Sequence, residues 1–395
     1  MTSGALHRTA GRITPGVAAL LIFVAAGGCV AAWRFLFGLS ATTNLDQQHP
    51  WGLWIAIDVA TGVALAAGGF TTAALAYIFH REDYRAITRP ALLTAMLGYT
   101  FVALGLLADL GRYYNIWHPI WPTMWQGDSV LFEVGMCVTV YLTVLYIEFL
   151  PIVCERFMRA GSRPRLAAVC ARVHRLVEGS MFLLIIAGVV LSCLHQSSLG
   201  NLMVIAPTKM HPLWWTPILS LLFLLSAVAV GFPMVVVESL AASWAMRHPP
   251  EMGLLARLAK YIPPLLGVYL AFKIGDMAIR ETYTRLLDGS VQSLAFLGEL
   301  VFGVIAPLVL LLFAKVRHSK QWLFVAALLV VLGVALNRVN VFLVAYQPPY
   351  ATRTYFPSIG EVVLTLGLIS GLILAYRLIA THLPVIAPHA EARTA

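Results

Sequence analysis

The chain has 395 residues, of which 60% are hydrophobic and only 11% are charged. Soluble domains carry about 25% charged residues, so a water-soluble globular fold is excluded and lipid must be the solvent for most of the chain. The net charge of +9 comes from basic residues spread over short loops, without a patch or a binding motif. Nucleic acid is therefore not an expected partner, and the basic residues report membrane orientation instead.

Ten apolar runs are long enough to cross a bilayer, which takes about 20 residues in a helix. In chain order they cover residues 14–38, 52–79, 90–111, 128–150, 172–194, 213–238, 261–283, 294–315, 322–345 and 358–381. They predict an all-α integral membrane protein in which residues 1–395 form a single transmembrane domain. We interpret spans two to five and six to nine as two four-helix bundles, with the first and last helices flanking them.

Most of the 27 lysine and arginine residues fall in alternate connections between the spans. The connection between the fourth and fifth spans is the richest in arginine. The positive-inside rule therefore places both termini in the cytoplasm, and an even number of spans agrees with that placement.

Ionisable residues at bilayer depth cost roughly 2.5–3.5 kcal/mol on insertion scales and usually face the bundle interior. On the predicted topology, Glu148, Glu178 and Glu238 lie at inner ends of spans. A larger set lies in the outer half: Arg34, Asp58, Asp109, Arg112, Glu133, Lys273, Asp276, Arg280, Glu299, Arg338 and Glu361. This asymmetry predicts a polar site near the outer face.

The fourth span carries Glu133, Tyr141 and Glu148 on one helical stripe. The two glutamates are about 22 Å apart along the axis at 1.5 Å per residue. Either this stripe conducts protons between an outer site and the cytoplasm, or Glu148 only marks the inner interface.

The seventh span places Lys273, Asp276 and Arg280 at i, i+3 and i+7, where they can pair with one another. A structural ion network and a part in proton traffic are both compatible with this spacing.

Polar and aromatic residues also gather at the outer ends of the second and third spans. A quinone head group needs hydrogen-bond donors for its two carbonyls and a nearby source of protons, which these residue types supply. The alternative is a set of ordinary interfacial loop residues. The candidates are His49, Trp51, Asp58, Asp109, Arg112 and Tyr113.

Haem and iron–sulfur sites depend on the placement of histidine and cysteine. A haem between helices needs histidines inside the spans, and all eleven histidines are expected in loops or at helix ends. The five cysteines form no CxxC pair, CxxCH motif or iron–sulfur spacing. The chain is therefore predicted to hold no haem, no iron–sulfur cluster and no metal ion.

Four stretches resemble the NrfD/PsrC family of quinone-interacting membrane subunits, most closely those that serve periplasmic nickel–iron hydrogenases. They are Asn44–Phe70, residues 103–118 and 129–151, and Asn337–Tyr355. The resemblance implies a multi-pass protein of the bacterial inner membrane that carries no redox cofactor and takes menaquinone or ubiquinone as an exchangeable substrate. It also implies partners on the outer face, namely a ferredoxin-like iron–sulfur subunit and the large and small hydrogenase subunits.

By this resemblance, the quinone pocket comprises His49, Trp51, Asp58, Asp109, Arg112, Tyr113 and Glu133. Glu133 is the first choice as proton donor to the quinone, with Asp58 and Asp109 as alternatives. Protons drawn through Glu148 and Tyr141 would make the reaction electrogenic. Rival functions are a quinone-reactive subunit of another oxidoreductase of this family, a proton-coupled secondary transporter, and a passive anchor.

Overall fold

The computed structural model describes residues 14–160, 164–245 and 249–385. Within these ranges ten helical spans are long and apolar enough to cross a membrane, and the only β pairing is an isolated bridge between Met210 and Tyr346. The predicted all-α class with ten spans is confirmed. The orientation of the termini stays a prediction.

The spans follow the predicted order, but several are assembled from shorter pieces. They are α2 (Pro15–Phe37); η2 (Trp54–Thr61), α3 (Gly62–Leu65), α4 (Gly68–Ala73) and η3 (Ala74–Ile78); α5 (Arg85–Asp109); α6 (Val130–Ala160); α7 (Pro164–Val204); α8 (Leu219–Ala245); α9 (Met252–Leu258) and α10 (Ile262–Ile279); α11 (Val291–Leu300), η11 (Val301–Ile305) and α12 (Ala306–Leu312); α14 (Lys320–Val339) and η12 (Asn340–Val344); and α15 (Ile359–His382). A short helix, α13 (Ala314–His318), precedes α14. Single 3₁₀ turns occupy Leu39–Ala41, Glu82–Tyr84, Tyr113–Asn115, His118–Ile120, Pro122–Met124, Pro207–Lys209, Ala259–Tyr261 and Thr282–Arg285.

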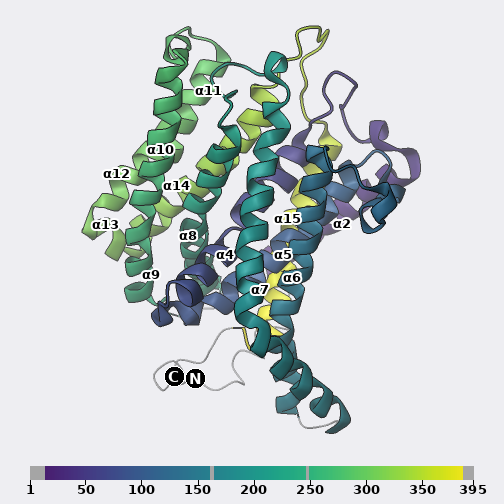
Figure 1. Ribbon diagram of the computed structural model, residues 1–395, viewed down its shortest axis with the longest axis vertical. Coiled ribbons are helices and arrows are strands. Elements are labelled where there is room, and N and C mark those ends of the chain that lie inside the picture. Colours follow the sequence, from purple (N-terminus) through teal and green to yellow (C-terminus); the bar gives the residue numbers. More distant parts are fainter. Residues whose placement is uncertain (1–13, 161–163, 246–248, 386–395) are drawn as a thin grey trace.

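The helices pack as two groups of four, as the sequence predicts (Figure 1). The second span, α5, α6 and α7 pack in one group, and α8, α10, α12 and α14 pack in the other. The groups meet where α7 and α4 pack on α8. Helices α2 and α15 pack on each other, and α15 also lies against α5. The first and last helices thus close the outside of the first bundle.

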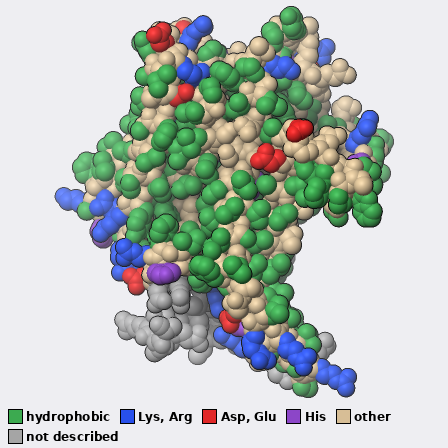
Figure 2. All heavy atoms as spheres, viewed as in Figure 1, with side chains coloured by type: hydrophobic (Ala, Val, Ile, Leu, Met, Phe, Trp, Pro, Cys, Tyr) green, Lys and Arg blue, Asp and Glu red, His purple; other side chains and the backbone are tan. Residues whose placement is uncertain are grey.

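Helices α6 and α7 are longer than their predicted spans of 128–150 and 172–194. Hydropathy marks the part of a helix that lies in lipid, whereas a helix can continue into water. The lower ends of α6 and α7 project from the body in Figure 1, and Figure 2 shows lysine and arginine side chains on this projection. Above it, hydrophobic side chains cover the middle of the visible face, which is the surface expected in lipid.

Close helix crossings depend on pairs of glycines. A Cβ on Gly333 would lie 2.2 Å from the Cα of Gly303, and a Cβ on Gly367 would lie 2.8 Å from the Cα of Gly27. Glycine therefore allows α14 to approach η11, and α15 to approach α2, at backbone contact distance.

Candidate functional site

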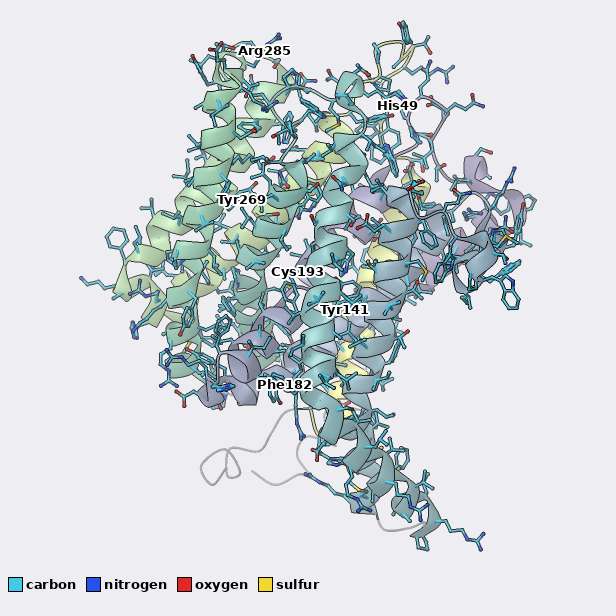
Figure 3. All side chains as sticks on the ribbon, viewed as in Figure 1. His49, Tyr141, Phe182, Cys193, Tyr269 and Arg285 are labelled. Atoms are coloured by element: carbon cyan, nitrogen blue, oxygen red, sulfur yellow. The ribbon has the colours of Figure 1, made fainter. Side chains whose placement is uncertain are left out.

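Polar side chains from distant parts of the chain converge near the end of the molecule where His49 lies (Figure 3). We name this group the outer cluster. It comprises Arg34, His49, Asp58, Asp109, Tyr355, Glu361 and Thr365. Helices α2 and α15 contribute to it because they pack beside the second span and α5.

Glu361 anchors the outer cluster and is fully buried in the first turn of α15. Its Oε2 accepts hydrogen bonds from the backbone N–H groups of Ser358 (2.8 Å) and Asn44 (3.2 Å). Its Oε1 accepts a hydrogen bond from the Tyr355 hydroxyl, whose oxygen accepts one from the Leu53 N–H at 2.9 Å. Burial, followed by the Glu361 carboxylate, raises the pKa of Tyr355. These contacts tie the last span to the start of the second.

Asp58 and Asp109 face the same region from η2 and α5. Asp58 is buried, and its Oδ2 accepts a hydrogen bond from the Thr365 hydroxyl at 2.6 Å. Asp109 lies near Arg34 and Glu361, and its buried Oδ1 has no hydrogen-bond partner among the described residues. A buried acceptor without a partner indicates a water or ligand site.

Arg34 fixes the outer end of α5. Its buried guanidinium donates from Nε to the Ala108 carbonyl (2.6 Å) and from Nη2 to the Leu110 carbonyl (2.5 Å). The two carbonyls flank Asp109, so Arg34 positions this carboxyl group as well as compensating its charge. The guanidinium also lies 5.2 Å from the ring centroid of Tyr113.

His49 lies in the turn before η2 and is buried. Its Nδ1 is 3.2 Å from Asp46 Oδ1, and its ring stacks on Tyr355 with 6.4 Å between centroids. The Asp46 carboxylate also accepts the His49 N–H at 2.6 Å, and this bond is the main reason why the pKa of Asp46 is lowered. His49 Nε2 has no hydrogen-bond partner among the described residues and is open to a ligand.

The other predicted pocket residues lie around the outer cluster. Trp51 packs edge-on against Phe342, with 6.2 Å between centroids, and Arg112 is exposed. Glu133 lies on an exposed face of α6, where its Oε1 accepts a hydrogen bond from the Ser198 hydroxyl at 2.6 Å. The structure therefore pairs Glu133 with α7 rather than with Asp58 or Asp109. Arg34, Tyr355 and Glu361 were not predicted as pocket residues, although Arg34 and Glu361 belong to the outer set of charges.

A second buried polar cluster lies in the other bundle, around Glu299 of α11. Its carboxylate pairs with Lys273 and accepts hydrogen bonds from Asn337 (2.8 Å), Asn340 (3.0 Å) and Trp214 (3.0 Å). Lys273 therefore pairs across helices and not within α10 as predicted. Both oxygens of Glu299 are bonded, which is the pattern of a structural ion network.

The remaining predicted pair on α10 does form. Arg280 Nε lies 3.0 Å from Asp276 Oδ2, and the Thr216 hydroxyl donates to Asp276 Oδ1 at 2.6 Å.

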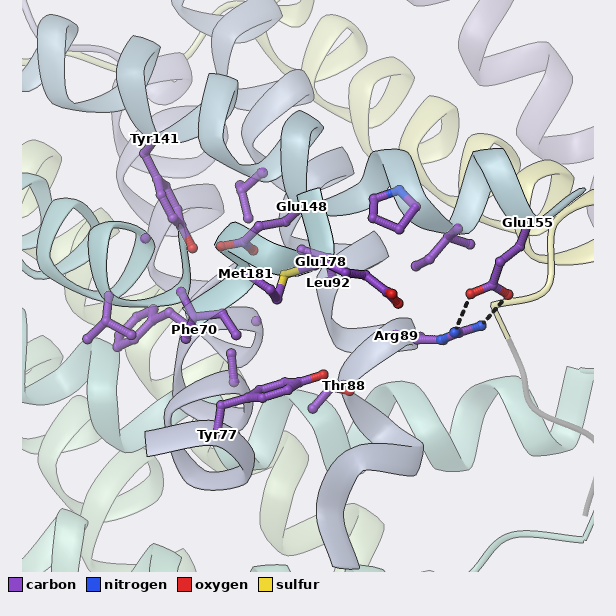
Figure 4. A pocket seen from close by; sticks show the side chains of 18 residues that line it. Phe70, Tyr77, Thr88, Arg89, Leu92, Tyr141, Glu148, Glu155, Glu178 and Met181 are labelled. Carbon is purple, nitrogen blue, oxygen red and sulfur yellow. Dashed lines mark hydrogen bonds and ion pairs between the residues drawn. The ribbon is translucent and has the colours of Figure 1, made fainter. Parts of the chain in front are cut away.

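At the opposite end, a cavity of about 120 Å³ opens between the second span, α5, α6 and α7 (Figure 4). Tyr141, Glu148 and Glu178 line it, and Arg89 pairs with Glu155 on its wall at 2.6 Å. The volume is below the roughly 300–1,000 Å³ of small-molecule pockets but is enough for several waters.

Three curated proteins are similar to this chain along nearly its whole length. The Escherichia coli K12 "Probable Ni/Fe-hydrogenase 2 b-type cytochrome subunit" is 35% identical over 90% of this chain and 88% of its own. The integral membrane subunit of menaquinone reductase from Nitratidesulfovibrio vulgaris is 28% identical, over 94% and 91%. A selenate reductase subunit from Mesobacillus selenatarsenatis is 24% identical, over 93% of each. These relatives are named as subunits of redox enzymes, and their similarity indicates that this chain lies in a lipid bilayer with redox enzyme partners.

The prediction that the chain holds no haem is wrong. A relative at 35% identity is named as a b-type cytochrome subunit, which makes haem a candidate cofactor here. The prediction also assumed that every histidine lies in a loop or at a helix end. His195 instead lies inside α7 and is fully buried. Helix α7 continues through 195–204, where Gln196 donates to the Val63 carbonyl.

A haem held between helices would need histidines with a free ring nitrogen at the right depth. Both ring nitrogens of His195 are engaged, by the Leu191 carbonyl and the Tyr99 hydroxyl. His174, also inside α7, lies about 30 Å away along the helix at 1.5 Å per residue. The other described histidines lie at helix ends or between helices, and His7, His248 and His389 lie outside the described residues. This arrangement of the described histidines does not fit a haem held by two histidines between the helices.

The model of the family described as "Polysulphide reductase, NrfD" matches residues 30–349, which is most of the chain. The resemblance in the sequence is thereby confirmed, and quinone use is consistent with this family. The chain is an integral membrane protein of the NrfD family.

Proposed function

We propose that this chain is the quinone-reactive membrane subunit of a redox enzyme complex, with the outer cluster as its quinone site. The partner enzyme is a nickel–iron hydrogenase that passes electrons through a ferredoxin-like iron–sulfur subunit on the outer face. Another oxidoreductase of the same family is the alternative partner. Similarity to a hydrogenase subunit and to a menaquinone reductase subunit supports the proposal.

The observation that carries the proposal is the unsatisfied buried oxygen of Asp109 in the outer cluster, together with the unbonded ring nitrogen of His49. Asp109 Oδ1 and His49 Nε2 are without partners in the described part of the chain, while the neighbouring Glu361 and Arg34 are bonded. The Glu299 carboxylate in the other bundle differs, because both of its oxygens are bonded, and the open atom of that cluster is a donor, Arg338 Nε. Asp109 Oδ1 and His49 Nε2 can accept hydrogen bonds from the two hydroxyls of a quinol, and in their protonated forms they can donate to the two carbonyls of a quinone.

The chemistry assigned to the site is a two-electron, two-proton reduction of quinone to quinol. The electrons come from the partner iron–sulfur chain, and the protons come from carboxyl groups of this chain. Asp58 and Asp109 lie in the outer cluster, and Glu133 lies on α6 beside Ser198. Positioned general acids typically contribute 10²–10⁴-fold in rate.

The test is the Asp109→Asn variant in the purified complex. Quinone reduction with the partner's own electron donor should fall roughly 100-fold, because the amide keeps the shape but cannot supply the proton. Donor oxidation with a soluble dye should be unchanged. Asp128→Asn, in an exposed outer turn, is the matched control. Wild-type quinone reduction in Asp109→Asn would refute the site, and a complex without any quinone reduction would refute the function.

A further inference from the structure

His195 is held in one tautomer in the interior of the first bundle. Its Nδ1 lies 2.7 Å from the Leu191 carbonyl oxygen, and its Nε2 faces the Tyr99 hydroxyl. A carbonyl only accepts, so the proton sits on Nδ1 and Nε2 accepts a hydrogen bond from Tyr99. His195 thus presents a basic nitrogen to a proton donor.

Further polar groups surround this pair at the same level. The Tyr141 ring lies 4.7 Å from that of Tyr99 and 5.5 Å from that of His195. Ser192 and Gln196 are fully buried next to the Tyr99 hydroxyl, and Ser192 also lies next to that of Tyr141. Ser192 Oγ and Gln196 Oε1 make no short hydrogen bond within the described residues. Unpaired buried oxygens beside tyrosine hydroxyls indicate ordered water between them.

The inner cavity leads up to this group. Tyr141 and Glu148 both line the cavity, and Tyr141 lies on the side away from the Arg89–Glu155 pair in Figure 4. They face each other beside Gly188, where a Cβ would lie 3.3 Å from Glu148 Oε1 and 3.4 Å from the Tyr141 ring. The missing side chain leaves room for water between the carboxyl group and the phenol.

Toward the outer side, α7 carries a further polar side chain one turn beyond His195. Ser198 follows about 4.5 Å along the axis and donates to Glu133 Oε1 at 2.6 Å. The stripe on α6 alone leaves about 12 Å between Tyr141 and Glu133, which is too far for a direct proton transfer. Polar residues of α7 fill this interval.

We propose that His195 is a proton-transfer residue at the middle of a path from the inner cavity to Glu133 and the quinone site. The proposal rests on the quinone-reactive function above. Nε2 takes a proton from the Tyr99 hydroxyl while the Tyr99 oxygen takes one from water beside Ser192. His195 then releases the Nε2 proton outward through water at Gln196. It neither gains nor loses protons over a cycle, and each quinone reduction draws two protons through the path.

The experiment uses the complete complex in proteoliposomes, with a pH dye in the compartment that the inner cavity faces. His195→Gln removes the basic nitrogen, and Tyr99→Phe removes only the hydroxyl oxygen. Both should lower kcat for quinone reduction at least about tenfold, leave KM for quinone unchanged and abolish proton uptake from the dye compartment. Tyr146→Phe is the matched control, because this α6 hydroxyl bonds Thr100 on an exposed face.

Several results would overturn the proposal. Wild-type turnover and inner-side uptake in both variants would exclude His195 and Tyr99 from the path, while quinone reduction itself stands. Haem absorption that disappears in His195→Gln would make this residue a haem ligand instead. If the complex with His195→Gln does not assemble, kcat and proton uptake of the Tyr99→Phe complex test the proposal instead. A wild-type complex that reduces no quinone would overturn the proposed function and this proposal with it.

Discussion

Tyr355 and Glu361 link the outer cluster to a part of the chain more than 300 residues away from His49. The Tyr355 hydroxyl is held between the Leu53 N–H and the Glu361 carboxylate, directly beside Gly52. This contact places the start of the second span against α15, and so it sets the position of Asp58. The geometry of the site therefore depends on a residue with no side chain.

Gly52→Ala should damage the quinone site without changing any polar group. The new Cβ would lie 2.8 Å from Glu361 Oε1, 2.9 Å from the Tyr355 hydroxyl and 2.7 Å from Leu45. Contacts this short force Tyr355 and Glu361 apart, and we expect KM for quinone to rise several-fold. Gly28→Ala in α2 is the control, since its Cβ meets nothing within 4 Å. Equal KM values for the two variants would show that this contact does not shape the site.

Glu133→Gln tests whether the exposed carboxyl group on α6 supplies protons to the quinone. The amide can keep the hydrogen bond to Ser198 but cannot carry a proton to a reduced quinone. Quinone reduction should fall by about 10²-fold while dye-linked oxidation in the partner is unchanged. Unchanged quinone reduction would leave Asp58 and Asp109 as the only candidate donors.

At the scale of elements, π-helical turns accompany both polar clusters. Asp58 lies within η2, Glu299 lies just before η11, and Asn340 begins η12. A π turn inserts an extra residue into a helix and re-aims the side chains around it, and such turns are frequent at functional sites. The two clusters differ in their bonding, because Glu299 is fully paired whereas Asp109 keeps an open oxygen.

The Lys273–Glu299 pair should prove structural. Lys273→Met leaves a buried carboxylate without its cation, which typically costs about 3–5 kcal/mol. We expect a clearly lower melting temperature of the complex, and a partial recovery in Lys273→Met/Glu299→Gln. The unpaired carboxylate is then gone, and the buried Arg338 guanidinium, which bonds Asn337, is the charge of this cluster that remains. Proton uptake per quinone, measured in the stable double variant, should equal that of the wild type. A loss of proton uptake in the double variant would show that the Lys273–Glu299 pair takes part in proton transfer.

Hydropathy predicts the ten spans well, because a run of about 20 apolar residues is a local property. Hydropathy fails at the end of α7. The polar residues there are typical of a loop, so the predicted span ends at residue 194; they are His195, Gln196, Ser198 and Asn201. Those side chains find partners on neighbouring helices, and only the packed bundle shows this. The position of His195 and the Lys273–Glu299 pair were missed for the same reason. Charges such as Arg34 and Glu361 were visible in the sequence, but their convergence with Asp58 is a tertiary fact.

At the scale of the whole molecule, the outer cluster and the inner cavity occupy opposite ends of the first bundle. The lower ends of α6 and α7, which project on the cavity side, carry arginines, and the loop that leads into α15 lies at the other end (Figure 1). The direction in which protons would move therefore depends on which end faces the cytoplasm. That orientation rests on the distribution of lysine and arginine alone.

Two added cysteines, each introduced alone into the parent chain, decide the orientation. Arg165→Cys places a thiol at the exposed lower end of α7, and Arg353→Cys places one in the exposed loop before α15. In intact spheroplasts, a membrane-impermeant maleimide should label Arg353→Cys, whereas Arg165→Cys should react only after the membrane is opened. The parent chain is the control, because its five native cysteines lie within helical spans. The reverse pattern would put the outer cluster on the cytoplasmic side, and the partner enzyme would then have to dock there.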